Sequence, residues 1–130
     1  MATLINVATP GPALQTSVID STVLGIHGLS VVFTSAGTPY ELAELALTAG
    51  LWVVTGVAGF NYGVVYAPAL YLNTASAVAS NSWPVQINSS YNSYISAVIK
   101  LSGTATIYLN GTTPVTTSTY YGFLTATQIG

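Results

Sequence analysis

The chain has 130 residues, of which 51% are hydrophobic and only 3% are charged, and it contains no cysteine. A typical soluble domain is about 25% charged, so this length and composition predict one domain whose surface carries unusually few charges. The charged residues are Asp20, Glu41, Glu44 and Lys100. One lysine and no arginine exclude a basic nucleic-acid site. The lack of cysteine excludes disulfides and cysteine-ligated metals.

A charge-free run extends from Leu45 to Ile99, and its first half is long enough to cross a bilayer. Gly50 and Pro68 are among the residues that interrupt it, and valine, tyrosine and threonine dominate where leucine would be expected, which favours strands. No lysine or arginine flanks the run to set an orientation. We therefore expect no membrane insertion, and instead a protein that shares much of its surface with other chains.

Residues 1–20 differ from the rest, because Pro10, Gly11 and Pro12 occur together and no hydrophobic period is visible. Proline restricts itself and the residue before it to extended backbone. We expect residues 1–20 to form an N-terminal arm or edge segment and residues 21–130 to form one β domain. The start of the chain lacks the basic region and apolar core of a signal peptide, so we expect synthesis and retention in the cytoplasm until assembly.

Strand-like segments separated by turn residues follow this arm. Residues 30–35 (SVVFTS) are β-branched and aromatic, and residues 37–39 (GTP) end them. Residues 40–49 suit a helix by composition and a strand by alternation, and we prefer the strand. Residues 51–60 (LWVVTGVAGF) are apolar on both faces, which predicts a strand covered on both sides.

The second half of the chain continues this pattern. We expect strands within residues 64–72, 84–90, 94–101, 105–109 and 120–129, and a polar loop over residues 73–82. In the strand over residues 94–101 the apolar and polar residues alternate, with Val98 as the exception. Asn110–Gly111 predicts a tight turn, and Pro114 keeps the following run off a central position. About eight short strands with frequent turns are typical of an all-β sandwich or barrel.

Few residues offer catalytic chemistry. His27 is the only histidine; Asp20 and Ser30 lie near it in sequence, but no nucleophile elbow surrounds a serine, and we interpret His27 as a loop residue. Glu41 and Glu44 are too few for a calcium site, which takes six to eight oxygen ligands. We therefore predict no catalytic residue, no metal site, no cofactor and no enzymatic activity.

Lys100 lies on the polar side of the strand predicted over residues 94–101. We expect it either to protect a sheet edge or to form a salt bridge with Glu41 or Glu44 of a neighbouring chain. The nine tyrosines and two tryptophans suit a core, a protein interface or stacking on sugars. We expect packing between subunits from Trp52, Phe60, Tyr108, Tyr121 and Phe123. We expect ligand or partner contacts from Tyr62, Tyr66, Trp83 and Tyr91.

Three segments resemble strands of small trimeric phage virion domains. Residues 47–60 (LTAGLWVVTGVAGF) resemble their opening strand, an apolar segment with a glycine, a tryptophan and a closing aromatic residue. Residues 93–111 (SYISAVIKLSGTATIYLNG) resemble their penultimate pair of strands. Residues 119–130 (TYYGFLTATQIG) resemble their closing strand, with Gln128 where arginine is common. The resemblance covers about residues 45–130.

This resemblance implies a jelly roll of about eight antiparallel strands, related to tumour necrosis factor and C1q heads, and a homotrimer without enzymatic activity. Such domains occur in phage fibres, spikes and capsid decoration proteins. We therefore expect a trimeric capsid decoration or cement protein on the virion surface, in contact with the major capsid protein or another virion protein. The alternative is a fibre or spike head that binds host-surface glycans or a receptor. Gln128 would not form any salt bridge that the arginine makes.

Overall fold

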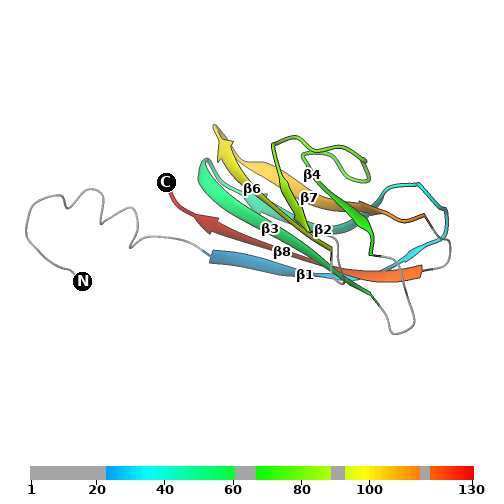
Figure 1. The fold of residues 1–130 in the computed structure, drawn as a ribbon. Coiled ribbons are helices and arrows are strands. Elements are labelled where there is room, and N and C mark those ends of the chain that lie inside the picture. The colour runs from blue at the N-terminus through cyan, green and yellow to red at the C-terminus, as the bar shows by residue number, and fades with distance from the viewer. Residues whose placement is uncertain (1–22, 61–66, 89–92, 115–117) are drawn as a thin grey trace, which may run out of the picture.

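The computed structural model describes residues 23–60, 67–88, 93–114 and 118–130 (Figure 1). These residues form strands and connecting loops, without a helix. The strands are β1 (Val23–Phe33), β2 (Tyr40–Leu47), β3 (Gly50–Phe60), β4 (Ala69–Asn73), β5 (Gln86–Asn88), β6 (Ser93–Leu101), β7 (Ala105–Thr112) and β8 (Ser118–Gln128). The all-β prediction is confirmed, and none of the described segments is a helix long and apolar enough to cross a membrane.

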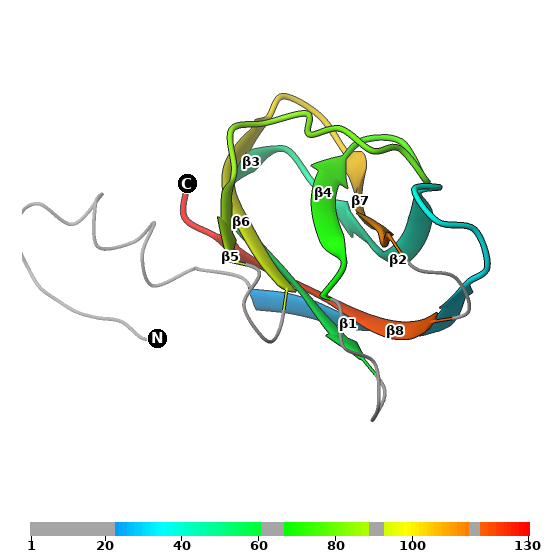
Figure 2. The ribbon, with the colours of Figure 1, turned by 45° about the vertical axis from the view of Figure 1, so that its right-hand side comes forward.

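The strands form two antiparallel sheets. The five-stranded sheet has the order β1-β8-β3-β6-β5, and the three-stranded sheet has the order β2-β7-β4. Figure 2 shows the three-stranded sheet lying over one side of the five-stranded sheet, whose central strand β3 lies between β8 and β6. The arrangement is that of a β-sandwich, in which one face of each sheet is buried.

The segment that suits both a helix and a strand is strand β2. Its register with β7 shifts between Glu41 and Ala43, so Leu42 is the extra residue of a β-bulge. Because of the bulge, the adjacent residues Leu42 and Ala43 are both buried. For the same reason Glu41 and Glu44, three positions apart, both lie opposite residues on the outward side of β7.

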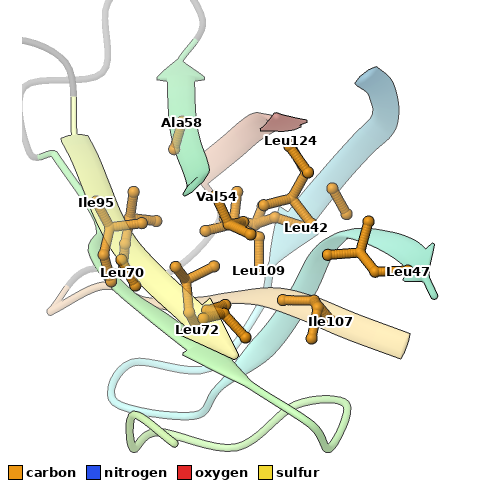
Figure 3. Close-up of a cluster of buried hydrophobic side chains, with 14 of the residues drawn as sticks. Leu42, Leu47, Val54, Ala58, Leu70, Leu72, Ile95, Ile107, Leu109 and Leu124 are labelled. Atoms are coloured by element: carbon orange, nitrogen blue, oxygen red, sulfur yellow. The ribbon is translucent and has the colours of Figure 1, made fainter. Parts of the chain in front are cut away.

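The core fills the space between the two sheets. Figure 3 shows its aliphatic side chains pointing toward one another from both layers; the labelled residues are Leu42, Leu47, Val54, Ala58, Leu70, Leu72, Ile95, Ile107, Leu109 and Leu124. The buried ring of Phe33 stacks on Tyr40, with ring centroids 4.6 Å apart, and lies 4.7 Å from the centroid of Tyr120. These aromatic contacts join β1, β2 and β8 across the sandwich.

Two glycines let the sheets approach each other closely. A Cβ atom on Gly56 would lie 2.6 Å from Cδ1 of Leu109, and one on Gly122 would lie 2.6 Å from the carbonyl oxygen of Leu42. Both glycines belong to the five-stranded sheet and both obstacles belong to the three-stranded sheet. At Gly122 the obstacle includes backbone atoms, so a side chain there would push the sheets apart, whereas at Gly56 the nearest atoms belong to side chains. Neither glycine has a positive φ.

The turn predicted at Asn110–Gly111 is wrong. Both residues lie inside β7, which pairs with β2 on one side and with β4 on the other. A Cβ atom on Gly111 would lie 2.9 Å from Cδ1 of Leu42, so a larger residue there would require that side chain to move. The asparagine–glycine pair lies in a strand and does not adopt the positive φ angles of a hairpin turn.

Most other predicted segments agree with the structure within the described residues. The short strand after Pro84 is β5, the polar loop predicted over residues 73–82 is present from residue 74, and the final strand is β8. Of the strand predicted over residues 64–72, residues 67–72 are described, and β4 begins at Ala69. The predicted arm, residues 1–20, lies outside the described residues.

Candidate interaction surface

The side of the five-stranded sheet that is turned away from the core is the main candidate surface, and we call it the outer sheet face. It consists of alternate residues of four strands. These are Val32, Leu51, Val53, Thr55, Val57, Tyr94, Ser96, Val98, Lys100, Tyr121, Phe123, Thr125 and Thr127. No described strand packs on this face, because the three-stranded sheet covers only the opposite side (Figure 2).

Apolar side chains form rows across the outer sheet face. The register places Tyr94, Val57 and Phe123 side by side on β6, β3 and β8, and it places Val98 beside Val53. Tyr94 is 38% exposed, Phe123 41% and Val98 60%. A polar row of Thr55, Ser96 and Thr125 lies between these two apolar rows. Exposed apolar side chains gathered on one face mark a site of contact with another molecule. Of the two faces of β3 that we expected to be covered, only the inner one is covered by a described element.

The three charged side chains of the described residues lie on opposite sides of the sandwich. Lys100 is exposed on the outer sheet face, whereas Glu41 and Glu44 lie on the outward side of the three-stranded sheet. Within the described ranges no ion pair joins the lysine to either acid, because both sheets lie between them. A salt bridge of Lys100 with a neighbouring chain therefore requires two different faces to meet, which is a heterologous contact.

The outward side of the three-stranded sheet is partly covered by residues 74–82, which we call the β4–β5 loop. The fully buried Asn110 fastens this loop to β7: its Oδ1 accepts the Ala77 N–H at 2.9 Å, and its Nδ2 donates to the carbonyl oxygens of Ala75 and Val78 at 3.0 and 3.2 Å. Ala77 has a positive φ of 55°. The sequence analysis missed this role of Asn110 because it assigned Asn110 and Gly111 to a tight turn.

The five residues predicted to pack between subunits are distributed over three environments. Phe123 is exposed on the outer sheet face and Tyr121 is half-buried there, while Tyr108 is half-buried on the outward side of the three-stranded sheet. Trp52 differs from the expectation: it is 1% exposed in the core of its own chain, and its Nε1 donates to the carbonyl oxygen of Thr48 at 3.0 Å. Phe60 ends β3, and its side chain lies outside the described residues.

Of the residues predicted to contact a ligand or partner, the structure describes one. Trp83 is half-buried and packs against the core cluster. Tyr62, Tyr66 and Tyr91 lie outside the described residues. A shallow groove of about 360 Å³ runs nearby, between the segment around Pro84 and the edge of β6, and no charged side chain lines it.

The residues weighed for catalysis and metal binding do not form a described cluster. His27 lies in β1, next to a register irregularity, and not in a loop as we expected. Glu41 accepts a hydrogen bond from the Ser76 hydroxyl at 2.5 Å, and Glu44 is exposed. In the part of the chain that the structure describes, no three histidine, aspartate or glutamate side chains gather to hold a metal ion.

Comparison with known family models, curated proteins and solved structures found no match for this chain. Its function is therefore inferred from its own strand pattern and surfaces.

Proposed function

We propose that this protein is a trimeric structural protein of a phage virion that decorates the capsid and stabilises the shell. The observation that carries the proposal is the outer sheet face, which is largely apolar, is covered by no described strand and carries, among the described residues, one charge at Lys100. Burying apolar surface stabilises an assembly by roughly 25 cal/mol per Å² before the free-energy losses of association are counted. The phage-like patterns in residues 47–60, 93–111 and 119–130 support the virion setting.

We further infer that the sandwich is a jelly roll. The order β1-β8-β3-β6 in one sheet and β2-β7-β4 in the other supports this, since strands β1 to β4 alternate between the sheets along the chain. Double-sheet jelly rolls of eight strands are common in viral capsid proteins. β5 pairs with β6 at the edge of the five-stranded sheet.

In a closed trimer each copy contacts its neighbours through two different patches. The outer sheet face of one copy would then meet another part of the next copy, and Lys100 would be placed to meet an acidic residue such as Glu44. Surface left uncovered by the trimer would contact the major capsid protein or another virion protein. Interfaces of this kind need about 800 Å² from each partner for stable association.

Sedimentation of the purified protein tests the trimer. We expect a species of three 13.4 kDa chains, and Val98→Asp should dissociate it because a buried unpaired carboxylate is strongly unfavourable. Ala36→Asp is the matched control, since Ala36 is exposed in the turn between β1 and β2 and lies on neither sheet face. A stable wild-type monomer would refute the trimer. A Val98→Asp protein that sediments like the Ala36→Asp trimer would show that the outer sheet face is not the interface.

Copy number in purified virions tests the decoration role. A capsid decoration protein is present in hundreds of copies at capsid symmetry sites, whereas a fibre head is present in a few dozen. Gel densitometry against the major capsid protein distinguishes the two. A count below one hundred would contradict the decoration role.

A fibre or spike head that binds glycans is the second candidate. The outward side of the three-stranded sheet favours it, because the half-buried rings of Tyr71 and Tyr108 and the exposed Glu44 carboxylate lie there. Aromatic rings stack on sugars, and carboxylates accept hydrogen bonds from sugar hydroxyls. Binding of the isolated protein to a glycan array, lost in Tyr108→Ala, would favour this function over decoration.

A further inference from the structure

Asn110–Gly111 is the one asparagine–glycine pair in the sequence, and such pairs are prone to deamidation. The backbone nitrogen of the glycine attacks the side-chain Cγ of the asparagine, a C–N bond forms, and ammonia leaves with the original amide nitrogen. Water then opens the cyclic succinimide to aspartate or isoaspartate. Glycine favours the attack because it has no Cβ atom to hinder the approach.

The folded protein opposes each part of this reaction. Asn110 is 0% exposed, so water does not reach its amide. Both atoms of that amide are engaged, with one hydrogen bond at Oδ1 and two at Nδ2. Gly111 lies in the central strand of its sheet, opposite Tyr40 on one side and Leu70 on the other. Its backbone nitrogen must leave this ladder before it can attack.

All three hydrogen bonds of the Asn110 side chain go to the β4–β5 loop, so opening of this loop frees the amide. The loop is fastened at further points: Asn73 Oδ1 accepts the Ala75 N–H at 2.9 Å, and Asn81 Oδ1 accepts the Leu72 N–H at 2.9 Å. Its weak point is Ala77, which donates to Asn110 with a φ of 55°, a conformation that residues other than glycine rarely adopt.

We propose that Asn110–Gly111 is a latent deamidation site that the β4–β5 loop keeps closed and whose reaction makes loop opening irreversible. An aspartate at position 110 has no N–H to donate to the carbonyl oxygens of Ala75 and Val78, and its charge would be buried beside them. An isoaspartate also adds a carbon atom to the backbone of β7 and shifts its register. Either product prevents the loop from closing again. This inference concerns the single folded chain and does not depend on the proposed virion role.

Peptide mass spectrometry after incubation at mildly alkaline pH tests the proposal, with the native protein and the urea-unfolded chain side by side. Asn81, which is exposed and precedes a serine, is the internal reference. In the unfolded chain, Asn110 should deamidate faster than Asn81. In the native protein, it should react about a hundredfold or more slowly than when unfolded, because reaction then requires local opening. Equal native and unfolded rates at Asn110 would overturn the proposal.

Variants of Ala77 test the role of the loop. Ala77→Pro lacks the N–H and cannot adopt a positive φ, so it should accelerate deamidation of Asn110 at least tenfold while hydrogen exchange at β3 stays slow. Ala77→Gly accepts the positive φ and should slow the reaction. Gly103→Ala is the control, because it lies in the turn before β7 and a Cβ there meets nothing within 4 Å.

If Ala77→Pro unfolds the whole chain, the deamidation rate of Asn110 in Ala77→Gly tests the role of the loop by itself. Rates in both Ala77 variants equal to that of Gly103→Ala would overturn the role of the loop.

Discussion

Replacing Gly122 with alanine would insert a methyl group between the two sheets. Its Cβ would lie 2.6 Å from both the Cβ and the carbonyl oxygen of Leu42, and 2.8 Å from the Leu42 carbonyl carbon. Since Leu42 is the bulged residue of β2 and the obstacle includes its backbone, no change of side-chain rotamer relieves the clash. The sheets must move apart locally, and contacts around the bulge are then lost.

The expected loss of stability follows from this geometry. Overpacking a core typically costs about 1–3 kcal/mol, and a backbone obstacle places Gly122→Ala at the upper end, about 3 kcal/mol. Domains have total stabilities of about 5–15 kcal/mol, and at this chain length each kcal/mol corresponds to about 3–4 °C in Tm. We therefore expect Tm to fall by about 10 °C.

Scanning calorimetry at one fixed protein concentration measures this, because self-association makes Tm concentration-dependent. The matched control is Gly59→Ala in β3, where a Cβ meets nothing within 4 Å. Its Tm should stay within about 2 °C of wild type, since an open strand position accepts alanine at little cost. If Gly122→Ala and Gly59→Ala melt together, the close approach of the sheets does not depend on Gly122.

Three further substitutions test the hydrogen-bonded loops. Asn110→Ala removes the three hydrogen bonds from the Asn110 side chain to the β4–β5 loop and should lower the free energy of unfolding by about 3 kcal/mol, as measured in urea; a loss below about 1 kcal/mol would contradict its fastening role. Ala77→Gly relieves the positive φ and should raise stability by about 0.5–1 kcal/mol; a lower Tm would refute the strain. Tyr40→Phe removes the hydroxyl that accepts the N–H groups of Thr34 and Ser35 at 3.2 and 3.0 Å. It should cost about 0.5–1 kcal/mol in urea unfolding, because these groups are exposed, and an unchanged midpoint would count against the bonds.

The fold class was accessible from the sequence because β-branched residues and alternation set strands locally. Whether β2 is a strand or a helix was harder to predict, since its alanines, leucines and glutamates also suit a helix. The segment is a strand because it pairs with β7, whose residues lie more than fifty positions further along the chain. The bulge at Leu42 was not predicted, although the adjacent apolar residues Leu42 and Ala43 break the alternation there.

The candidate surface was likewise only partly predictable from the sequence. The break in alternation at Val98 was visible in the sequence, and the structure makes Val98 the most exposed large apolar side chain of the described residues. Trp52 was misleading, because an aromatic residue on an apolar strand is equally compatible with a core and an interface. Asn110–Gly111 matched a turn signal, but the loop that covers the asparagine is distant in sequence and could not be foreseen.

The separation of Lys100 from Glu41 and Glu44 gives the described part of the chain an electric dipole directed through the thickness of the sandwich. No other aspartate, glutamate, lysine or arginine occurs among the described residues. In a solution of low ionic strength, where fields reach beyond about 10 Å, this dipole would orient the molecule before any contact forms. A positively charged surface would meet the three-stranded sheet first, and a negatively charged one would meet the side of Lys100.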